Sequence, residues 1–176
     1  GMLLAWKILQ QAAPELAAQV SLPRSYFVGA NVFYDFKALN QLEHNQKYKS
    51  PEQIRDEYPG LVEDHLRARF PEEVADRLRE ILSEVGHTPL IVRSSSLLED
   101  NFGTSFAGKY ASYFCPNQGT LKENLRDLTT AIRRIYASVY NPDVLTYRRR
   151  MGLLDYDERM AILLQPVQGE KHGRLF

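Results

Sequence analysis

The sequence has no excess of either charge, almost no cysteine and no long apolar run, and each shortage excludes a class of protein. Lysine and arginine (22) balance aspartate and glutamate (22), and the formal net charge is +0 at pH 7. There is therefore no bulk basic field to hold nucleic acid or an anionic membrane, so any anion site must be local. No run of apolar residues has the length of a membrane span, and no signal peptide is apparent. A cytoplasmic protein is the simplest interpretation.

The lone cysteine, Cys115, cannot form an internal disulfide, and its place in a strand-like run predicts a small buried hydrophobe. The chain has 176 residues, of which 44% are hydrophobic and 25% charged, which suits one globular domain with its own core. Gly1-Met2 resembles a tag remnant, and the chain closes on an apolar pair. We therefore expect residues 1–176 to form a single partial domain of a longer protein.

Helical and strand patterns alternate irregularly, without an internal repeat. This order predicts an α+β fold, in which a mixed or antiparallel sheet carries helices on one face. The clearest amphipathic helix is expected to begin after Thr120, which forms a capping box with Glu123. Helices are expected over residues 2–11, 31–39, 50–58, 71–86, 120–139 and 144–150, and strands over residues 26–28, 90–93, 109–115 and 160–164.

A charged helical insert is expected between the strand-rich parts, from Gln46 to Gly86. Ser50-Pro51-Glu52-Gln53 is a helix-start signature, and Tyr58-Pro59-Gly60 is expected to end that helix. A second helix begins near Pro71 and ends at Gly86. The insert could be a lid above a site or a plain helical subdomain, and both interpretations stay open.

The most informative stretch is PLIVRSSSLLEDNFGTSFAGKYA, from Pro89 to Ala111. A short apolar run is followed by Arg93 and then by three hydroxyl residues, Ser94 to Ser96. A small-residue turn, Ser105-Phe106-Ala107-Gly108, follows and ends at Lys109. Two cations, several hydroxyls and a glycine that lets backbone N–H groups approach a ligand are the parts of a polyphosphate site. A surface arginine and a plain glycine hairpin are the alternatives.

This stretch resembles the N-terminal nucleotide-binding domain of the phosphoenolpyruvate synthase and pyruvate phosphate dikinase family. In that family, V-R-S-S at a strand end is followed by an E-D pair and an S-F-A-G turn. LPRSYFVGANVFYDF, RRIYAS, VLTYR and MAILLQPV also resemble family segments. The resemblance implies the first lobe of an ATP-grasp fold, in which two α+β lobes close on a nucleotide.

The resemblance also implies which residues bind ATP. Arg93 would contact phosphate oxygens, and Ser105, Gly108 and Lys109 would belong to a flap over the phosphates. Lys109 replaces a glutamine that many relatives carry. The strand Met160 to Val167 would run toward the connection between the lobes, so that Gln165 and Val167 become candidates beside the adenine.

The acidic pair Glu99 and Asp100 could suggest a magnesium site, because hard cations prefer carboxylate oxygens. In the family, however, the metal carboxylates lie in the second lobe. We therefore expect no metal ligand and no catalytic residue in this chain, and these acids are expected to pair with Arg93 or Lys109. Mg²⁺ would be held by residues outside it.

The resemblance thus predicts an ATP-binding lobe of a phosphoenolpyruvate synthase-like phosphotransferase. By the same resemblance, the full enzyme would pass a phosphoryl group from ATP to a histidine and then to an acceptor such as pyruvate. The implied partners of this lobe are ATP, a second lobe and a phosphohistidine domain, with no nucleic acid or membrane. The family's G-G-K motif is not found at the start of this sequence, and none of the four histidines has a family-like context.

Two alternatives remain open at this point. One is a non-catalytic ATP-sensing or interaction domain derived from the same family. The other is a nucleic-acid or anion-binding module on the segment 133–150. Zero net charge argues against the second alternative. Within the triple Arg148-Arg149-Arg150, a solvated helix end is expected, and Arg148 is the one that could point inward.

Overall fold

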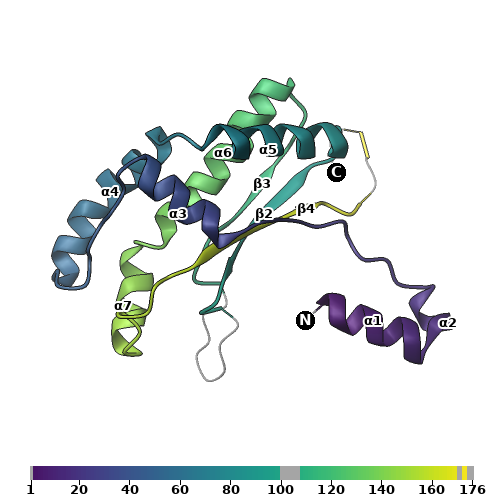
Figure 1. Cartoon of the computed structure of the whole chain (residues 1–176), viewed down its shortest axis with the longest axis horizontal. Coiled ribbons are helices and arrows are strands. Elements are labelled where there is room, and N and C mark those ends of the chain that lie inside the picture. The colour runs from purple at the N-terminus through teal and green to yellow at the C-terminus, as the bar shows by residue number, and fades with distance from the viewer. Residues whose placement is uncertain (1, 100–107, 170–171, 174–176) are drawn as a thin grey trace.

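The computed structural model describes residues 2–99, 108–169 and 172–173. Within these residues, four strands form one antiparallel sheet in the order β1 (Tyr26–Val28), β4 (Met160–Pro166), β2 (Leu90–Ser96) and β3 (Ser112–Cys115). Figure 1 shows this sheet at the centre of the chain. The α+β class and the antiparallel sheet predicted from the sequence are confirmed.

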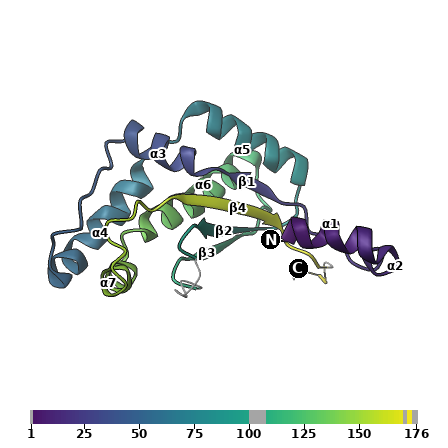
Figure 2. The same ribbon diagram turned by 60° about the horizontal axis from the view of Figure 1, so that its bottom comes forward.

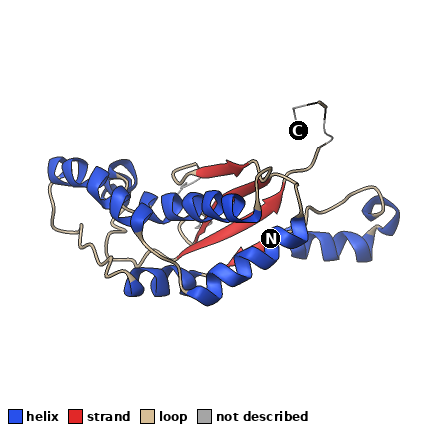
Figure 3. Cartoon of the chain, turned by 90° about the horizontal axis from the view of Figure 1, so that it is seen from above, coloured by secondary structure: helices blue, strands red, loops and turns tan. Residues whose placement is uncertain are grey.

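Helices pack against one face of this sheet: α3 packs on β4, α6 packs on β2 and β3, and α5 packs on α6 (Figure 1). Figure 3 shows the strands in red and the helices in blue. By contrast, α1 and α2 stand apart from the sheet (Figure 2). None of the helices in the described ranges combines the length and the hydropathy needed to cross a membrane. The helices are α1 (Met2–Ala12), α2 (Pro14–Ala17), α3 (Ala30–Leu39), α4 (Pro51–Arg67), α5 (Glu72–Val85), α6 (Leu121–Ser138) and α7 (Pro142–Arg150).

Alternation along the strands gives the sheet two different faces. Leu90 and Val92 of β2 are fully buried under the helices, whereas Arg93, in the same strand, is exposed. The register places Phe27 of β1, Leu163 of β4 and Arg93 of β2 in one row. We call the face opposite the helices the open face; its residues are Phe27, Ile91, Arg93, Ser95, Ser112, Phe114, Ala161, Leu163 and the buried Gln165.

The core lies between the sheet and the helices, and aromatic rings fill its centre. Phe33 and Phe36 of α3 contact Tyr136 of α6, with ring centroids 4.9 and 5.3 Å apart, respectively. Burial raises the pKa of Tyr136, so its hydroxyl stays neutral. Burial likewise raises the pKa of the Cys115 thiol to about 11, which agrees with the buried, unreactive cysteine predicted from the sequence.

The predicted helix end at Tyr58-Pro59-Gly60 is wrong, because α4 continues through Pro59 to Arg67. A proline inside a helix removes one backbone hydrogen bond but does not force an end. In this helix, the turns beyond Pro59 bury Leu61 and His65. That burial holds the second half of the helix in place. The capping box at Ser50 and Gln53 is confirmed.

Further boundaries differ from the prediction; β3, for example, begins at Ser112 and not at residue 109, and β4 extends to Pro166. Asn31 is not the cap of α3, because Gly29 occupies that position and Asn31 lies in the first turn. The serines Ser94 to Ser96 belong to strand β2, where they pair with Ile162, Ala161 and Met160 of β4. This pairing extends the strand beyond its apolar part, so Arg93 lies in the middle of β2 and not at its tip.

The segment Gln46 to Gly86 contributes to the core through both of its helices. α4 and α5 each pack on α6, and they bury Ile54 and Leu78, respectively. The turn at Gly86 has a φ of +66° and ends α5, at the predicted place.

Candidate functional site

Arg93 is a predicted site residue that the structure leaves exposed to solvent. Its strand neighbours are Leu163 of β4 and Ser112 of β3, all on the open face. Within the described ranges, its guanidinium makes no ion pair and no hydrogen bond to another side chain. A planar, permanently charged donor fork that faces solvent from a rigid strand is well suited to an anionic ligand.

The second predicted anion-binding element is only partly visible. Ser105 and Phe106 lie outside the described residues. Gly108 adopts a φ of +72°, in the left-handed region that glycine accepts without strain. Lys109 is exposed, and its Nζ lies 5.1 Å from the centroid of the Tyr147 ring on α7. The lysine charge is therefore stabilised by an aromatic face and still accessible to solvent.

Gln165 and Val167, the two residues expected beside adenine, lie at the C-terminal end of β4. The Gln165 side chain is buried, and its Nε2 donates to Ser25 Oγ over 2.9 Å. The backbone N–H of Val167 donates to the Pro89 carbonyl oxygen over 2.8 Å. These groups are thus engaged in joining β4 to its neighbours. Because the Val167 N–H is already engaged, a ligand could form a hydrogen bond only to the Val167 carbonyl oxygen.

The acidic residue Glu99 shapes the end of β2. Its carboxylate accepts from the Ser96 backbone N–H over 3.0 Å and from Ser94 Oγ over 3.2 Å. This arrangement closes a turn, and Asp100 lies outside the described residues. Among the described residues, no group of three or more His, Cys, Asp or Glu side chains could hold a metal ion.

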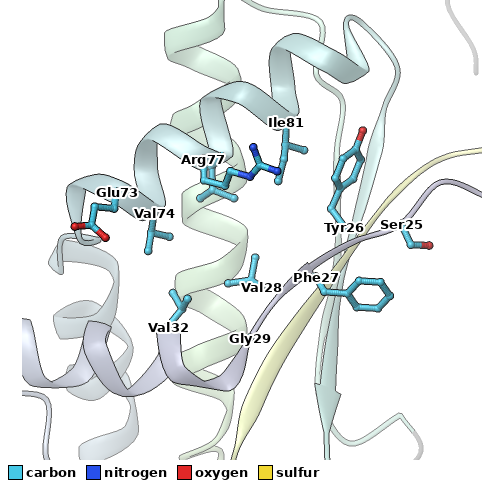
Figure 4. Close-up of a pocket in the computed structure, with 11 residues that line it drawn as sticks. Ser25, Tyr26, Phe27, Val28, Gly29, Val32, Glu73, Val74, Arg77 and Ile81 are labelled. Carbon is cyan, nitrogen blue, oxygen red and sulfur yellow. The ribbon is translucent and has the colours of Figure 1, made fainter.

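A separate hollow lies on the helical side of β1, between that strand and α5. It has a volume of about 450 Å³, and Figure 4 shows Val28 and Val32 pointing into it, with Val74 on the facing helix. Its charged lining residues are Glu73 and Arg77, which carry opposite charges. This mostly apolar hollow lies on the other side of the sheet from Arg93, so it does not add to a phosphate site there.

Comparison with known proteins decides the family. Residues 8–173 match the model of the pyruvate phosphate dikinase AMP/ATP-binding domain. The chain belongs to this family. Pyruvate phosphate dikinase-type domains of this kind bind adenine nucleotides, and the family resemblance seen in the sequence is therefore confirmed.

Three relatives show the range of enzymes in which such a domain occurs. The chain is 28% identical to an uncharacterized phosphotransferase of Bacillus subtilis, over 88% of this chain and 17% of the relative. It is 26% identical to a phosphoenolpyruvate synthase of Aquifex aeolicus, over 84% of this chain and 18% of the relative. It is 34% identical to a rifampicin phosphotransferase of Streptomyces sviceus, over 55% of this chain and 11% of the relative. The chain thus spans less than a fifth of the length of these relatives.

The described residues of this AMP/ATP-binding domain are compatible with a nucleotide. The open face offers an accessible guanidinium at Arg93, and the exposed rings of Phe27 and Phe114 with the half-buried Leu163 offer apolar surface beside it. A nucleotide needs both kinds of surface, because its phosphates are anionic and its base is flat and largely apolar.

Sequence reasoning missed a buried polar cluster around Glu158. This carboxylate is only 5% exposed, and it accepts from Tyr110 Oη over 2.7 Å and from Ser96 Oγ. Arg148 Nη1 lies 4.0 Å from Glu158 Oε2, so the prediction that Arg148 points inward is confirmed. An acidic residue two positions before an apolar strand carries no recognisable signal. Only the fold shows that these four side chains meet.

Proposed function

We propose that this domain is the ATP-binding lobe of a phosphotransferase of the phosphoenolpyruvate synthase type. In this proposal, the open face of the sheet is the floor of the nucleotide site, and Arg93 binds the phosphates. The observation that carries the proposal is the exposed Arg93 guanidinium, without an ion pair among the described residues, in a member of an AMP/ATP-binding family.

The order of the predicted residues along the sheet supports this assignment. Gln165 pairs with Ile91, which lies two residues before Arg93 on β2. Ser96, at the end of β2 from which the chain leads to Gly108 and Lys109, lies three residues after Arg93. At about 3.3 Å per residue, the distance from the Gln165 level to the end of β2 is roughly 17 Å. An extended nucleotide could therefore place its base toward Gln165 and Val167 and its phosphates toward Arg93 and Lys109.

Each residue would contribute binding and orientation. The Arg93 fork would donate two parallel hydrogen bonds to phosphate oxygens and offset their charge throughout transfer. Lys109 would add a second cation, and Ser105 and Gly108 would offer hydroxyl and backbone donors to the same group. Mg²⁺ would neutralise further phosphate charge, and its ligands are expected outside this chain.

In this proposal, the remaining parts of the enzyme would lie outside the domain described above. A second ATP-grasp lobe would cover the open face and exclude water from the phosphates. A phosphohistidine domain would accept the phosphoryl group and pass it to an acceptor. The relatives include a phosphoenolpyruvate synthase and a rifampicin phosphotransferase. The names of these two relatives imply different acceptors, of which pyruvate is one.

The test is phosphoryl transfer in the longest natural form of the protein. We expect incubation with β- and γ-labelled ATP to leave acid-labile label on a histidine, and Arg93→Ala to lower that labelling at least tenfold. Arg55→Ala serves as the matched control, because Arg55 is an exposed arginine on α4, among the helices. If ATP binds but no histidine is labelled, the ATP-sensing alternative replaces phosphotransfer. If ATP does not bind, both fail.

A further inference from the structure

The carboxylate of Glu158 is buried, which costs free energy unless partners inside the fold compensate for the lost water. Its residue is 5% exposed, and it lies just before β4. Moving a carboxylate out of water is expensive unless hydrogen bonds and an opposite charge replace the water. Here the replacement consists of two hydroxyl donors, from Tyr110 and Ser96, and the guanidinium of Arg148.

These partners come from three separate parts of the chain. Ser96 is the last residue of β2, and Tyr110 lies two residues before β3. They are the two roots of the segment 97–109, which carries Gly108 and Lys109 at its second end. Arg148 belongs to α7. One carboxylate therefore joins both roots of this segment to each other and to α7.

Each root is held further by its own contacts. At the first root, Ser96 Oγ accepts from the Leu98 backbone N–H over 3.0 Å, and Ser96 N–H donates to Glu99. At the second root, Lys109 is adjacent to Tyr110 and rests on the Tyr147 ring of α7. Arg148 is itself held by the carbonyl oxygens of Leu153 and Tyr156. The Glu158 carboxylate accepts a hydrogen bond from each of the two roots.

We propose that Glu158 is a positioning residue for nucleotide binding. It sets the distance between the two roots, and so fixes Arg93 on β2 relative to Lys109 beside Tyr110. It does not touch the nucleotide. This inference rests on the proposed function, because it assumes that Arg93 and Lys109 bind the same ligand.

A buried acid could also serve stability alone, so the test must separate the two roles. We would measure the dissociation constant for Mg-ATP and the midpoint of thermal unfolding for Glu158→Gln and Tyr110→Phe in the intact chain. Tyr110→Phe keeps the ring and removes one anchor of one root. The matched control is Leu78→Ala, which destabilises the core beneath α5, away from both roots.

Loss of a hydrogen bond to a charged group should weaken Mg-ATP binding about tenfold in both Glu158→Gln and Tyr110→Phe. Leu78→Ala should lower the unfolding midpoint at least as much and leave the dissociation constant within about twofold. If the affinities of Glu158→Gln and Tyr110→Phe fall no more than that of Leu78→Ala, the role is structural and the proposal is overturned. Should Glu158→Gln not fold, Tyr110→Phe and Ser96→Ala provide the same comparison.

Amide hydrogen exchange distinguishes this proposal from the proposed function. Glu158→Gln should speed exchange at both roots, around Leu98 and around Tyr110, and leave α3 unchanged. If exchange rises at both roots but the unaltered chain does not bind ATP, the proposed function fails and the coupling of the roots stands. If exchange at the two roots is unchanged, the positioning role fails whatever the affinity for ATP.

Discussion

Two arginines of this domain show how burial separates a ligand-binding charge from a structural one. Arg148 is 5% exposed and surrounded by carbonyl oxygens and the Glu158 carboxylate. These groups hold the Nη atoms of its guanidinium inside the fold, while its buried Nε has no hydrogen-bond partner among the described residues. Arg93 lies on the open face without an ion pair in the described part of the chain. Its removal should therefore affect binding much more than folding.

Backbone conformation at Gly108 gives a second test on the residue scale. Its φ of +72° disfavours a side chain, so Gly108→Ala should lower the free energy of unfolding by about 1 kcal/mol. Gly60 is the matched control, because it lies inside helix α4 and an added Cβ would meet nothing within 4 Å. Gly60→Ala should raise stability by about 0.5–1 kcal/mol. Chemical denaturation measures both, and changes of the same sign would contradict this account.

Single residues also show what the sequence could and could not reveal. Arg93 and Gly108 could be proposed as binding residues because they lie in a continuous motif, and the burial of Arg148 agrees with the expectation that it is the one arginine of its triple that could point inward. Glu158 and Tyr110 were missed because their meeting depends on long-range strand pairing. No local pattern records a contact between residues 48 positions apart.

Among the elements, α4 departs most from its sequence pattern. Its turns beyond Pro59 exist because Leu61 and His65 enter the core. Tertiary burial thus outweighs the local penalty of a proline. The same reason explains β2, where three serines that usually favour turns are held in a strand by β4. Helices with strong amphipathic patterns and caps, such as α5 and α6, were predictable because local and tertiary preferences agree.

The burial of His65 makes the stability of α4 depend on pH. Its Nδ1 lies 2.7 Å from the Leu61 carbonyl oxygen, which can only accept, and burial lowers the pKa of the ring from 6.5 to about 4. Between these values the unfolded chain binds the proton and the folded chain does not. Stability should therefore be complete above pH 6.5 and fall by up to about 3 kcal/mol as the pH drops toward 4.

Denaturant titrations at several pH values would measure this dependence. His65→Gln should flatten the slope between pH 6.5 and 4, since glutamine does not titrate there. His44→Gln is the companion variant, because burial also lowers the pKa of His44, whose ring centroid lies 6.0 Å from that of His65. An unchanged slope in His65→Gln would show that other groups cause the acid sensitivity.

On the scale of the whole molecule, the two faces of the sheet differ in how far they are covered. Helices bury one face, while the other face keeps Phe27, in the row of Arg93, 67% exposed and Phe114, opposite Ile91, 69% exposed. A sheet that is apolar on both faces is usually covered on both. Because the chain spans less than a fifth of its relatives, we propose that a second lobe covers this face and that ATP lies between.

This central claim is tested most directly by mapping where Mg-ATP contacts the domain. In a titration followed by amide chemical shifts, we expect the largest changes at Ile91, Arg93, Leu163 and Lys109, and we expect Arg93→Ala to weaken the response at least tenfold. Arg55→Ala should leave the response unchanged. Changes concentrated instead on the hollow between β1 and α5, or the same affinity with and without Arg93, would contradict the account.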